Sequence, residues 1–300
     1  MDGKQLRTQY KEHLSDFNNW NQKEHAEDFI LYPKNIGYHL CIDETALSKG
    51  ELYTILTNRD KHGRKGTIVA IVKGTKAEDV INVLLKIDAD KRNQVKEITL
   101  DMAGSMQKIA KRCFPGAMQV VDRFHVSKLV YEAVQDLRIA YRWQVMKDEN
   151  RKIKEAKAKG ESYEPKVFGN GDTLRQLLAR SRYLLFKAPD KWLQSQKVRA
   201  KLLFEQFPDI KSVYYYALRL GKIFSDYTDK DVARAKLALW YNEIEEFGYD
   251  TFTTVANSIE NHYERILNYF VNRSTNAAAE AFNAKIKAFR ASFRGVVDKR

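Results

Sequence analysis

Cysteine is scarce in this chain. It contains two, Cys41 and Cys113, both within apolar runs, and it has no CxxC pair. Zinc modules and disulfide frameworks both need clustered or paired cysteines. Their scarcity therefore argues against a zinc module on this chain and favours a reducing, cytoplasmic setting.

Long apolar segments are missing as well. The longest uninterrupted apolar runs are far shorter than the roughly 20 residues that a membrane-spanning helix needs. Residues 1–5 (MDGKQ) lack the apolar core of a signal peptide. No internal repeat or low-complexity segment is evident, which argues against a solenoid or an array.

Acidic residues are outnumbered by basic ones. The chain has 52 Lys and Arg against 39 Asp and Glu, so its net charge is +13. Such a basic protein suits a polyanionic partner, most often nucleic acid, although solubility alone is the simpler alternative. Hydrophobic residues make up 44% of the 300 residues, which is enough to build a packed core in one large domain or two ordinary ones.

Strand and helix patterns alternate in the first half of the chain. Strands are predicted at residues 38–45 (YHLCIDET), 51–58 (ELYTILTN), 66–73 (GTIVAIVK), 95–101 (VKEITLD) and 117–122 (AMQVVD). Helices are predicted over 1–20, 76–88 and 105–112, and residues 25–35 form a connector in which Pro33 prevents a helix. This order predicts an α/β fold with a mixed five-stranded sheet and flanking helices.

Helical periodicity replaces the strand patterns after Phe124. A long helix is predicted over 129–159, charged and solvated from Lys147 on, and Asp172 or Thr173 is expected to cap the next helix. Further helices are predicted over 173–186, 189–206, 209–224, 229–246 and 251–270. The predicted divisions are therefore an N-terminal helix and connector (1–35), a first part of the core (36–128), an all-α insertion (129–271) and a C-terminal helix that returns to the core (272–300).

Aspartates stand at the ends of three predicted strands: Asp43, Asp101 and Asp122. A carboxylate at the end of an apolar strand is costly to bury unless a cation, a proton or water accompanies it. The carboxyl ends of parallel strands gather at one edge of a sheet, where α/β proteins place their sites. Asp43 and Asp101, joined by a third carboxylate, could hold two Mg²⁺ ions and support phosphoryl transfer.

Glu280 is the candidate for that third carboxylate. Residues 272–276 (NRSTN) offer turn and cap chemistry, and the Ala-rich stretch that follows predicts a helix with Glu280 in its first turn. Taken alone, Glu280 is simply a favourable first-turn residue. The same stretch carries residues suited to a DNA phosphate backbone: Asn283, Lys285, Lys287, Arg290 and Arg294.

His125 follows Asp122 at the start of a helix. It could orient a phosphate, assist a proton transfer or bond Asp122, and taken alone it is most simply structural. Glu44 points to the face opposite Asp43 and is a weak candidate. Asp88, Asp90 and Glu97 are expected to be surface charge.

Three segments together resemble the DDE-type transposases of bacterial insertion sequences, in the ISL-three-like group. They are CIDETAL (residues 41–47), TLDMAGSMQKIAKRCFPGAMQVVDRFHVSKLV (99–130) and RSTNAAAEAFNAKIKAFRASFRGV (273–296), in the order of that family. The resemblance covers residues 30–297 or so. It implies an RNase H-like core interrupted by a helical insertion. It also implies a metal-binding catalytic triad of Asp43, Asp101 and Glu280, with Asp122 and His125 in the D-x-F-H segment.

The resemblance also implies an activity and its partners. Such enzymes use Mg²⁺ or Mn²⁺, with two ions expected, to nick the ends of an insertion sequence by hydrolysis. The freed 3′-hydroxyl then attacks target DNA without a covalent protein–DNA intermediate. The implied setting is the bacterial cytoplasm in association with the nucleoid, and the implied assembly is a homo-oligomer, at least a dimer, on two DNA ends.

Two departures from the family pattern affect these expectations. Members usually carry an N-terminal zinc-binding and helix-turn-helix region, whereas this chain begins almost at the catalytic part. It resembles the split, ISAon-one-like members, for which a separate small DNA-binding protein is the expected partner. Members also usually continue beyond the FRGV segment, which leaves an inactive DNA-binding remnant as one alternative. An RNase H-like nuclease or resolvase without strand transfer is the other.

Overall fold

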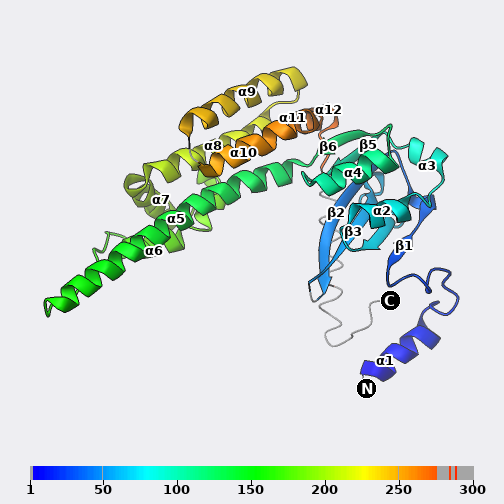
Figure 1. Ribbon diagram of the computed structural model, residues 1–300, viewed down its shortest axis with the longest axis horizontal. Coiled ribbons are helices and arrows are strands. Elements are labelled where there is room, and N and C mark those ends of the chain that lie inside the picture. Colours follow the sequence, from blue (N-terminus) through cyan, green and yellow to red (C-terminus); the bar gives the residue numbers. More distant parts are fainter. Residues whose placement is uncertain (1–2, 49, 249, 276–283, 285–287, 289–300) are drawn as a thin grey trace. The chain divides into compact units, whose positions relative to one another are not determined.

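The computed structural model describes residues 3–48, 50–248 and 250–275, together with 284 and 288. These residues form two compact units (Figure 1). The first comprises the residues up to Phe124 and the described residues from Glu264 on, and the second comprises His125–Tyr263.

The first unit is built on a mixed sheet with the strand order β1-β4-β3-β2-β5-β6. Its strands are β1 (Phe29–Leu31), β2 (His39–Ser48), β3 (Glu51–Asn58), β4 (Ile68–Lys73), β5 (Glu97–Leu100) and β6 (Met118–Val121). The pairs β1–β4, β3–β4 and β2–β3 are antiparallel, whereas β2–β5 and β5–β6 are parallel. This order is that of an RNase H-like sheet, so the predicted α/β fold class is confirmed.

The sheet has six strands where five were predicted. The additional strand, β1, lies in the expected connector and pairs with residues 70–72 of β4. Three residues are too few to show the alternation that identifies a strand in a sequence. Tyr32 and then Pro33 follow, and Pro33 begins a short 3-10 turn (Pro33–Asn35), where a proline is tolerated because the first amide of a helix has no partner within it.

Two helices cover one face of the sheet. These are α2 (Ala77–Leu84) and α4 (Gly104–Cys113), and the short α3 (Ala89–Asn93) lies between them in the chain. Their buried side chains share one hydrophobic cluster with Leu40 and Ile42 of β2 and with Ile98 and Leu100 of β5. Because side chains alternate along a strand, the intervening residues of β2 and β5 project from the opposite face.

The N-terminal helix is shorter than predicted. α1 (Gly3–Gln9) passes into a single π-helical turn over Tyr10–Leu14, and the helix ends there rather than at residue 20. Leu6 and Leu14 on it are exposed. A helix with one apolar face is usually stabilised by burial of that face in the tertiary structure. The leucines of this helix are exposed, which agrees with its ending earlier than predicted.

The second unit is all-helical in its named elements. It contains α5 (Arg123–Ala158), which starts at the end of the first unit, followed by α6 (Leu174–Arg180), α7 (Gln194–Gln206), α8 (Pro208–Asp226), α9 (Lys230–Phe247) and α10 (Asp250–Asn261). The single helix predicted over 251–270 is divided into α10, α11 (Tyr263–Leu267) and α12 (Tyr269–Asn272).

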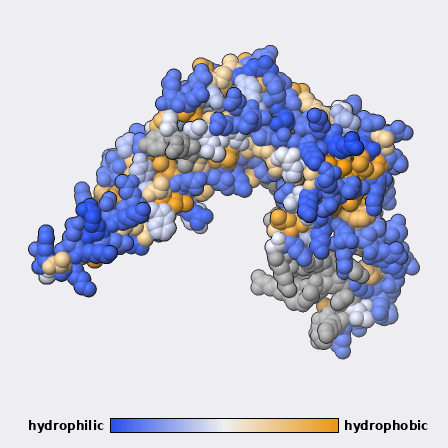
Figure 2. Space-filling view, viewed as in Figure 1, coloured by the Kyte–Doolittle hydropathy of each residue, from blue (hydrophilic) through white to orange (hydrophobic). Residues whose placement is uncertain are grey.

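The last part of α5 is solvated, as its charge predicts. Residues 147–158 are mostly exposed, and Figure 2 shows hydrophilic residues covering this end of the helix. None of the helices in the described ranges is long and apolar enough to cross a bilayer.

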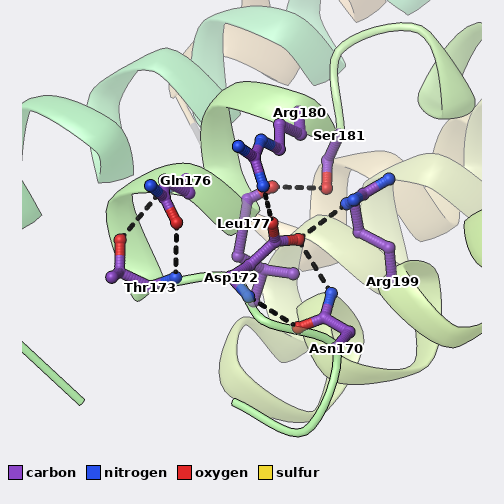
Figure 3. A network of polar contacts seen from close by, with 8 residues as sticks. All are labelled: Asn170, Asp172, Thr173, Gln176, Leu177, Arg180, Ser181 and Arg199. Carbon is purple, nitrogen blue, oxygen red and sulfur yellow. Dashed lines mark hydrogen bonds and ion pairs between the residues drawn. The ribbon is translucent and has the colours of Figure 1, made fainter. Parts of the chain in front are cut away.

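A buried carboxylate fixes the turn that precedes α6 (Figure 3). Asp172 is 0% exposed and accepts hydrogen bonds from Asn170 Nδ2 at 2.8 Å, Arg180 Nη1 at 2.5 Å and Arg199 Nε at 2.8 Å. Burial alone would raise the pKa of Asp172, but the two arginines outweigh burial and lower it. Thr173, not Asp172, caps α6 by accepting a hydrogen bond from the Gln176 amide.

Candidate active site

The register of β2 and β5 brings two of the predicted acids to the same level of the sheet. Cys41 of β2 pairs with Thr99 of β5, the last pair of this parallel ladder. Asp43 comes two residues further along β2, and Asp101, two residues after Thr99, directly follows the end of β5. Neighbouring strands lie about 4.8 Å apart, and residues two apart share a face, so both acids project from the face opposite α2 and α4.

Asp122 continues this row onto β6. Thr99 pairs with Val120, and Asp122 lies two residues beyond it. The backbone amide of Asp122 donates a 3.0 Å hydrogen bond to the carbonyl of Leu100, which carries the ladder to this point. Asp43 on β2 and the aspartates that directly follow β5 and β6 therefore come at matching positions along three adjacent strands.

The electrostatic effects of these acids agree with that placement. Burial raises the pKa of Glu44, and the charges of Asp101 and Asp43 raise it further. Burial also raises the pKa of the Cys41 thiol, with added contributions from Asp43 and Asp122. Asp43 therefore acts on Glu44 together with Asp101, and on Cys41 together with Asp122. This overlap indicates that the three aspartates share a region of negative potential.

A backbone amide positions each carboxylate. Oδ1 of Asp43 accepts from the Glu44 amide at 2.8 Å, and Oδ1 of Asp101 accepts from the Ala103 amide at 2.8 Å. Both aspartates are half-buried. Rigid carboxylates that keep some access to solvent are suited to binding a hard cation.

Asp122 is held differently. It is 1% exposed, and its Oδ1 accepts a 3.2 Å hydrogen bond from the Phe124 amide in the first turn of α5. This is the interaction of a helix cap, where negative charge is favoured. His125 lies half-buried in the same turn.

Asp43 is not at the end of its strand, contrary to the prediction. β2 continues to Ser48 because it pairs with β3 in a long antiparallel hairpin. Only the parallel ladder with β5 stops near Asp43. The parallel ladder stops because β5 ends at Leu100, whereas β2 continues past Asp43.

The chain returns from the insertion to the face that carries Asp101. Glu97 of β5 is on that face, and its Oε2 accepts a 2.8 Å hydrogen bond from Asn272 at the end of α12. Nearby, Nδ2 of Asn268 donates to the carbonyl of Gln119 on β6 at 3.0 Å. The segment that precedes Glu280 in the chain is thus attached to β5 and β6.

Glu97 was expected to be surface charge, and that expectation is wrong. It is 1% exposed, and Arg59 Nη1 lies 2.6 Å from its Oε1. Burial would raise the pKa of Glu97, but the hydrogen bond from Asn272 and the Arg59 cation lower it overall. The alternation of Glu97, Thr99 and Asp101 along one strand was the sequence signal that could have revealed it.

A family model described as a transposase matches residues 40–299. The chain belongs to the ISL-three-like DDE transposases. Searches of the curated proteins and of the solved structures each found no match. The matched range in this transposase contains Asp43, Asp101 and Glu280.

Several predicted site residues of this transposase lie outside the described residues. They are Glu280, Asn283, Lys285, Lys287, Arg290 and Arg294. Within the described ranges, no group of three or more His, Cys, Asp or Glu side chains is arranged to hold a metal ion. Of the predicted site, the described residues therefore include Asp43 and Asp101 beside adjacent strands and the segment before Glu280 that is attached to β5 and β6.

Proposed function

We propose that this transposase is a catalytic subunit that cleaves DNA at the ends of an insertion sequence and joins the freed ends to target DNA. The observation that carries the proposal is the register of β2 and β5, which sets Asp43 and Asp101 side by side on one face. The return of the chain to that face through Asn272 supports Glu280 as the third ligand.

The donor set suits a hard divalent cation. Asp43 and Asp101 offer carboxylate oxygens on adjacent strands, and such oxygens are the ligands that Mg²⁺ and Mn²⁺ prefer. We propose that Asp43, Asp101 and Glu280 hold two such ions. When bound, the ions would neutralise charge on the phosphodiester and activate the attacking oxygen.

The chain's own residues position the reactants in this proposal. The amides of Glu44 and Ala103 fix the two aspartates, so the ligands need little rearrangement when DNA binds. His125 is proposed to orient the scissile phosphate or accept a proton, and Asp122 to set the start of α5. Asn283, Lys285, Lys287, Arg290 and Arg294 are proposed to contact the DNA backbone.

Two parts of the proposal concern assembly. DNA, as element ends and as target, is the substrate of this basic protein. We propose that a separate small protein supplies recognition of the element ends, and that the catalytic subunit acts as a homo-oligomer that holds two ends together.

The decisive experiment is strand transfer in Mg²⁺ with a pre-cleaved 3′-hydroxyl end, with the separate small DNA-binding protein added. Replacing a direct metal ligand should cost at least the 10- to 100-fold that loss of an outer-shell partner costs. We therefore expect Asp43→Asn and Asp101→Asn to reduce joining by about 100-fold or more, and Asp90→Asn, an exposed helix residue, to leave it unchanged.

Each alternative predicts a different outcome of this assay. Metal-dependent hydrolysis without joining would identify a nuclease. No metal-dependent reaction, together with identical behaviour of wild type and Asp43→Asn, would identify an inactive DNA-binding remnant. Retained folding of Asp43→Asn, measured by circular dichroism, excludes unfolding as the cause of any loss.

A further inference from the structure

A cavity of about 690 Å³ lies in the second unit, between α5 and the segment that follows α6. Gln135, Arg138 and Trp143 line it from α5, and Arg182 and Phe186 line it from the opposite segment. This volume is within the range of about 300–1,000 Å³ that is common for ligand sites. None of the predicted catalytic residues that the structure describes lines it.

Arg138 is one of three arginines in the cavity and is the most buried, at 4% exposed. Its partners are neutral: Nε donates to Gln135 Oε1 at 2.7 Å, and Nη1 donates to the Leu178 carbonyl at 3.0 Å. Burial lowers the pKa of Arg138, and the nearby charges of Arg142 and Arg182 lower it further. The three cations are therefore close enough to repel one another.

Among the residues that the structure describes, no ion pair joins any of these arginines to an acid. Nε of Arg142 is buried without a hydrogen-bond partner in the described structure. The one acid among the lining residues, Glu132, lies 3.7 Å from Lys128 Nζ. Three clustered arginines with largely neutral surroundings form a site for an anion, and guanidinium groups match phosphate geometry well.

Large aromatic side chains are exposed among the lining residues. Trp143 is 59% exposed, Tyr183 is 69% exposed and Phe186 is 45% exposed. The Arg182 guanidinium lies 5.5 Å from the centre of the Tyr183 ring. Exposed aromatic rings beside arginines are the combination that proteins use to stack unpaired bases while holding the phosphate backbone.

We propose that this cavity binds an unpaired nucleotide of single-stranded DNA. Arg142 and Arg182 contact its phosphate, and Trp143 stacks on its base. Duplex DNA fits this chemistry less well, because its base faces are covered by stacking within the helix. The proposal shares with the proposed function only that DNA is the partner, and it requires neither metal nor the catalytic acids.

The test measures binding of a fluorescent mixed-sequence single strand to the full chain, in EDTA so that catalysis plays no part. Loss of one stacked base typically weakens binding by about 5- to 150-fold. We therefore expect Trp143→Ala to weaken binding of the single strand by a factor in this range, and Trp143→Phe to retain most of the affinity. Arg142→Gln should weaken binding and reduce the salt slope of log K by about 0.7, the value for one phosphate contact on a single strand.

Arg151→Gln is the matched control, because Arg151 is on the same helix but its side chain is 62% exposed, outside the cavity. This control variant should lower the affinity for the single strand by less than twofold. The affinity for a duplex of the same sequence should fall by less than twofold when Trp143→Ala is introduced. Wild-type affinity in both Trp143→Ala and Arg142→Gln overturns the proposal, as does an equal loss for duplex and single strand. Binding in EDTA has no metal-dependent step, so failure of the catalytic proposal, which is measured as loss of joining in Mg²⁺, gives a different result.

Discussion

Buried and half-buried carboxylates in this protein have two kinds of surroundings. Asp172 faces two arginines, and Glu97 faces Arg59 and Asn272, so their charges are balanced within the chain. Asp43 and Asp101 lie near a third acid, because their charges raise the pKa of Glu44 beyond the effect of its burial. Acids that lie together suit a cation, so this row rather than Asp172 is the candidate site.

Replacing Asp172 should destabilise the second unit. Breaking a buried ion pair leaves its partner unbalanced and costs about 3–5 kcal/mol. Arg180 is 54% exposed and can be resolvated, so we expect Asp172→Asn to cost about 3 kcal/mol of unfolding free energy, measured with urea at pH 7. Asp148→Asn, in an exposed pair, should stay within about 0.5 kcal/mol; an equal effect of the two would contradict this account.

The contribution of Asp172 should depend on pH in one direction. Its pKa is lowered in the folded protein, so its stabilisation is fully present above the unfolded value of about 3.9. It is lost as pH falls through the folded value. The stability difference between wild type and Asp172→Asn should therefore be constant from pH 6 to 7 and shrink below about pH 4; a difference that grows on acidification would be inconsistent with the lowered pKa.

At the scale of elements, α11 and α12 connect the insertion to the sheet. Asn268 and Asn272 attach this connection to β6 and β5, and Arg273 follows in the left-handed conformation with φ 50°. These contacts hold the chain on the Asp101 face just before the stretch that carries Glu280. If Glu280 is the third ligand, as proposed, hydrogen bonds outside the ligand set would hold the segment that leads to it.

Removing the Asn272 amide should loosen this connection. A hydrogen bond to a charged group contributes about 1.5–3 kcal/mol, so Asn272→Ala should lower the unfolding free energy by about 2 kcal/mol. Hydrogen exchange of residues 268–275 should rise, and strand transfer should fall more than single-strand binding in EDTA. Asn93→Ala, at an exposed position, is the control. Unchanged exchange in Asn272→Ala would show that the connection does not rely on this contact.

At the scale of the whole molecule, the net charge of +13 governs the interaction with DNA. Each phosphate neutralised by Lys or Arg releases counterions, so affinity depends steeply on salt. Contact with six or more phosphates predicts a fall in duplex affinity of about 1,000-fold or more between 50 and 200 mM salt. Fluorescence anisotropy in EDTA measures this directly. A change below tenfold would mean that the excess charge serves solubility instead.

The sequence by itself determined the fold class and the two aspartates that the structure sets side by side. Asp43 and Asp101 follow apolar alternating runs, which marked them as candidates, and the pairing of β2 with β5 then set them on adjacent strands. The helical region after Phe124 followed from periodicity in the same way. β1 was not predicted, because three residues are too few to show the alternation of a strand. The continuation of β2 past Asp43 was not predicted either, because it depends on the hairpin with β3.

Only the tertiary structure decided how distant charges are arranged. Glu97 lies 1% exposed against Arg59 and Asn272, and these partners are far from it in the chain, so the sequence does not show which groups balance its charge. The clustering of Arg138, Arg142 and Arg182 likewise requires α5 to pack beside the segment after α6. Periodicity reports which face of an element is apolar, whereas the partner of a charge is set by packing between elements.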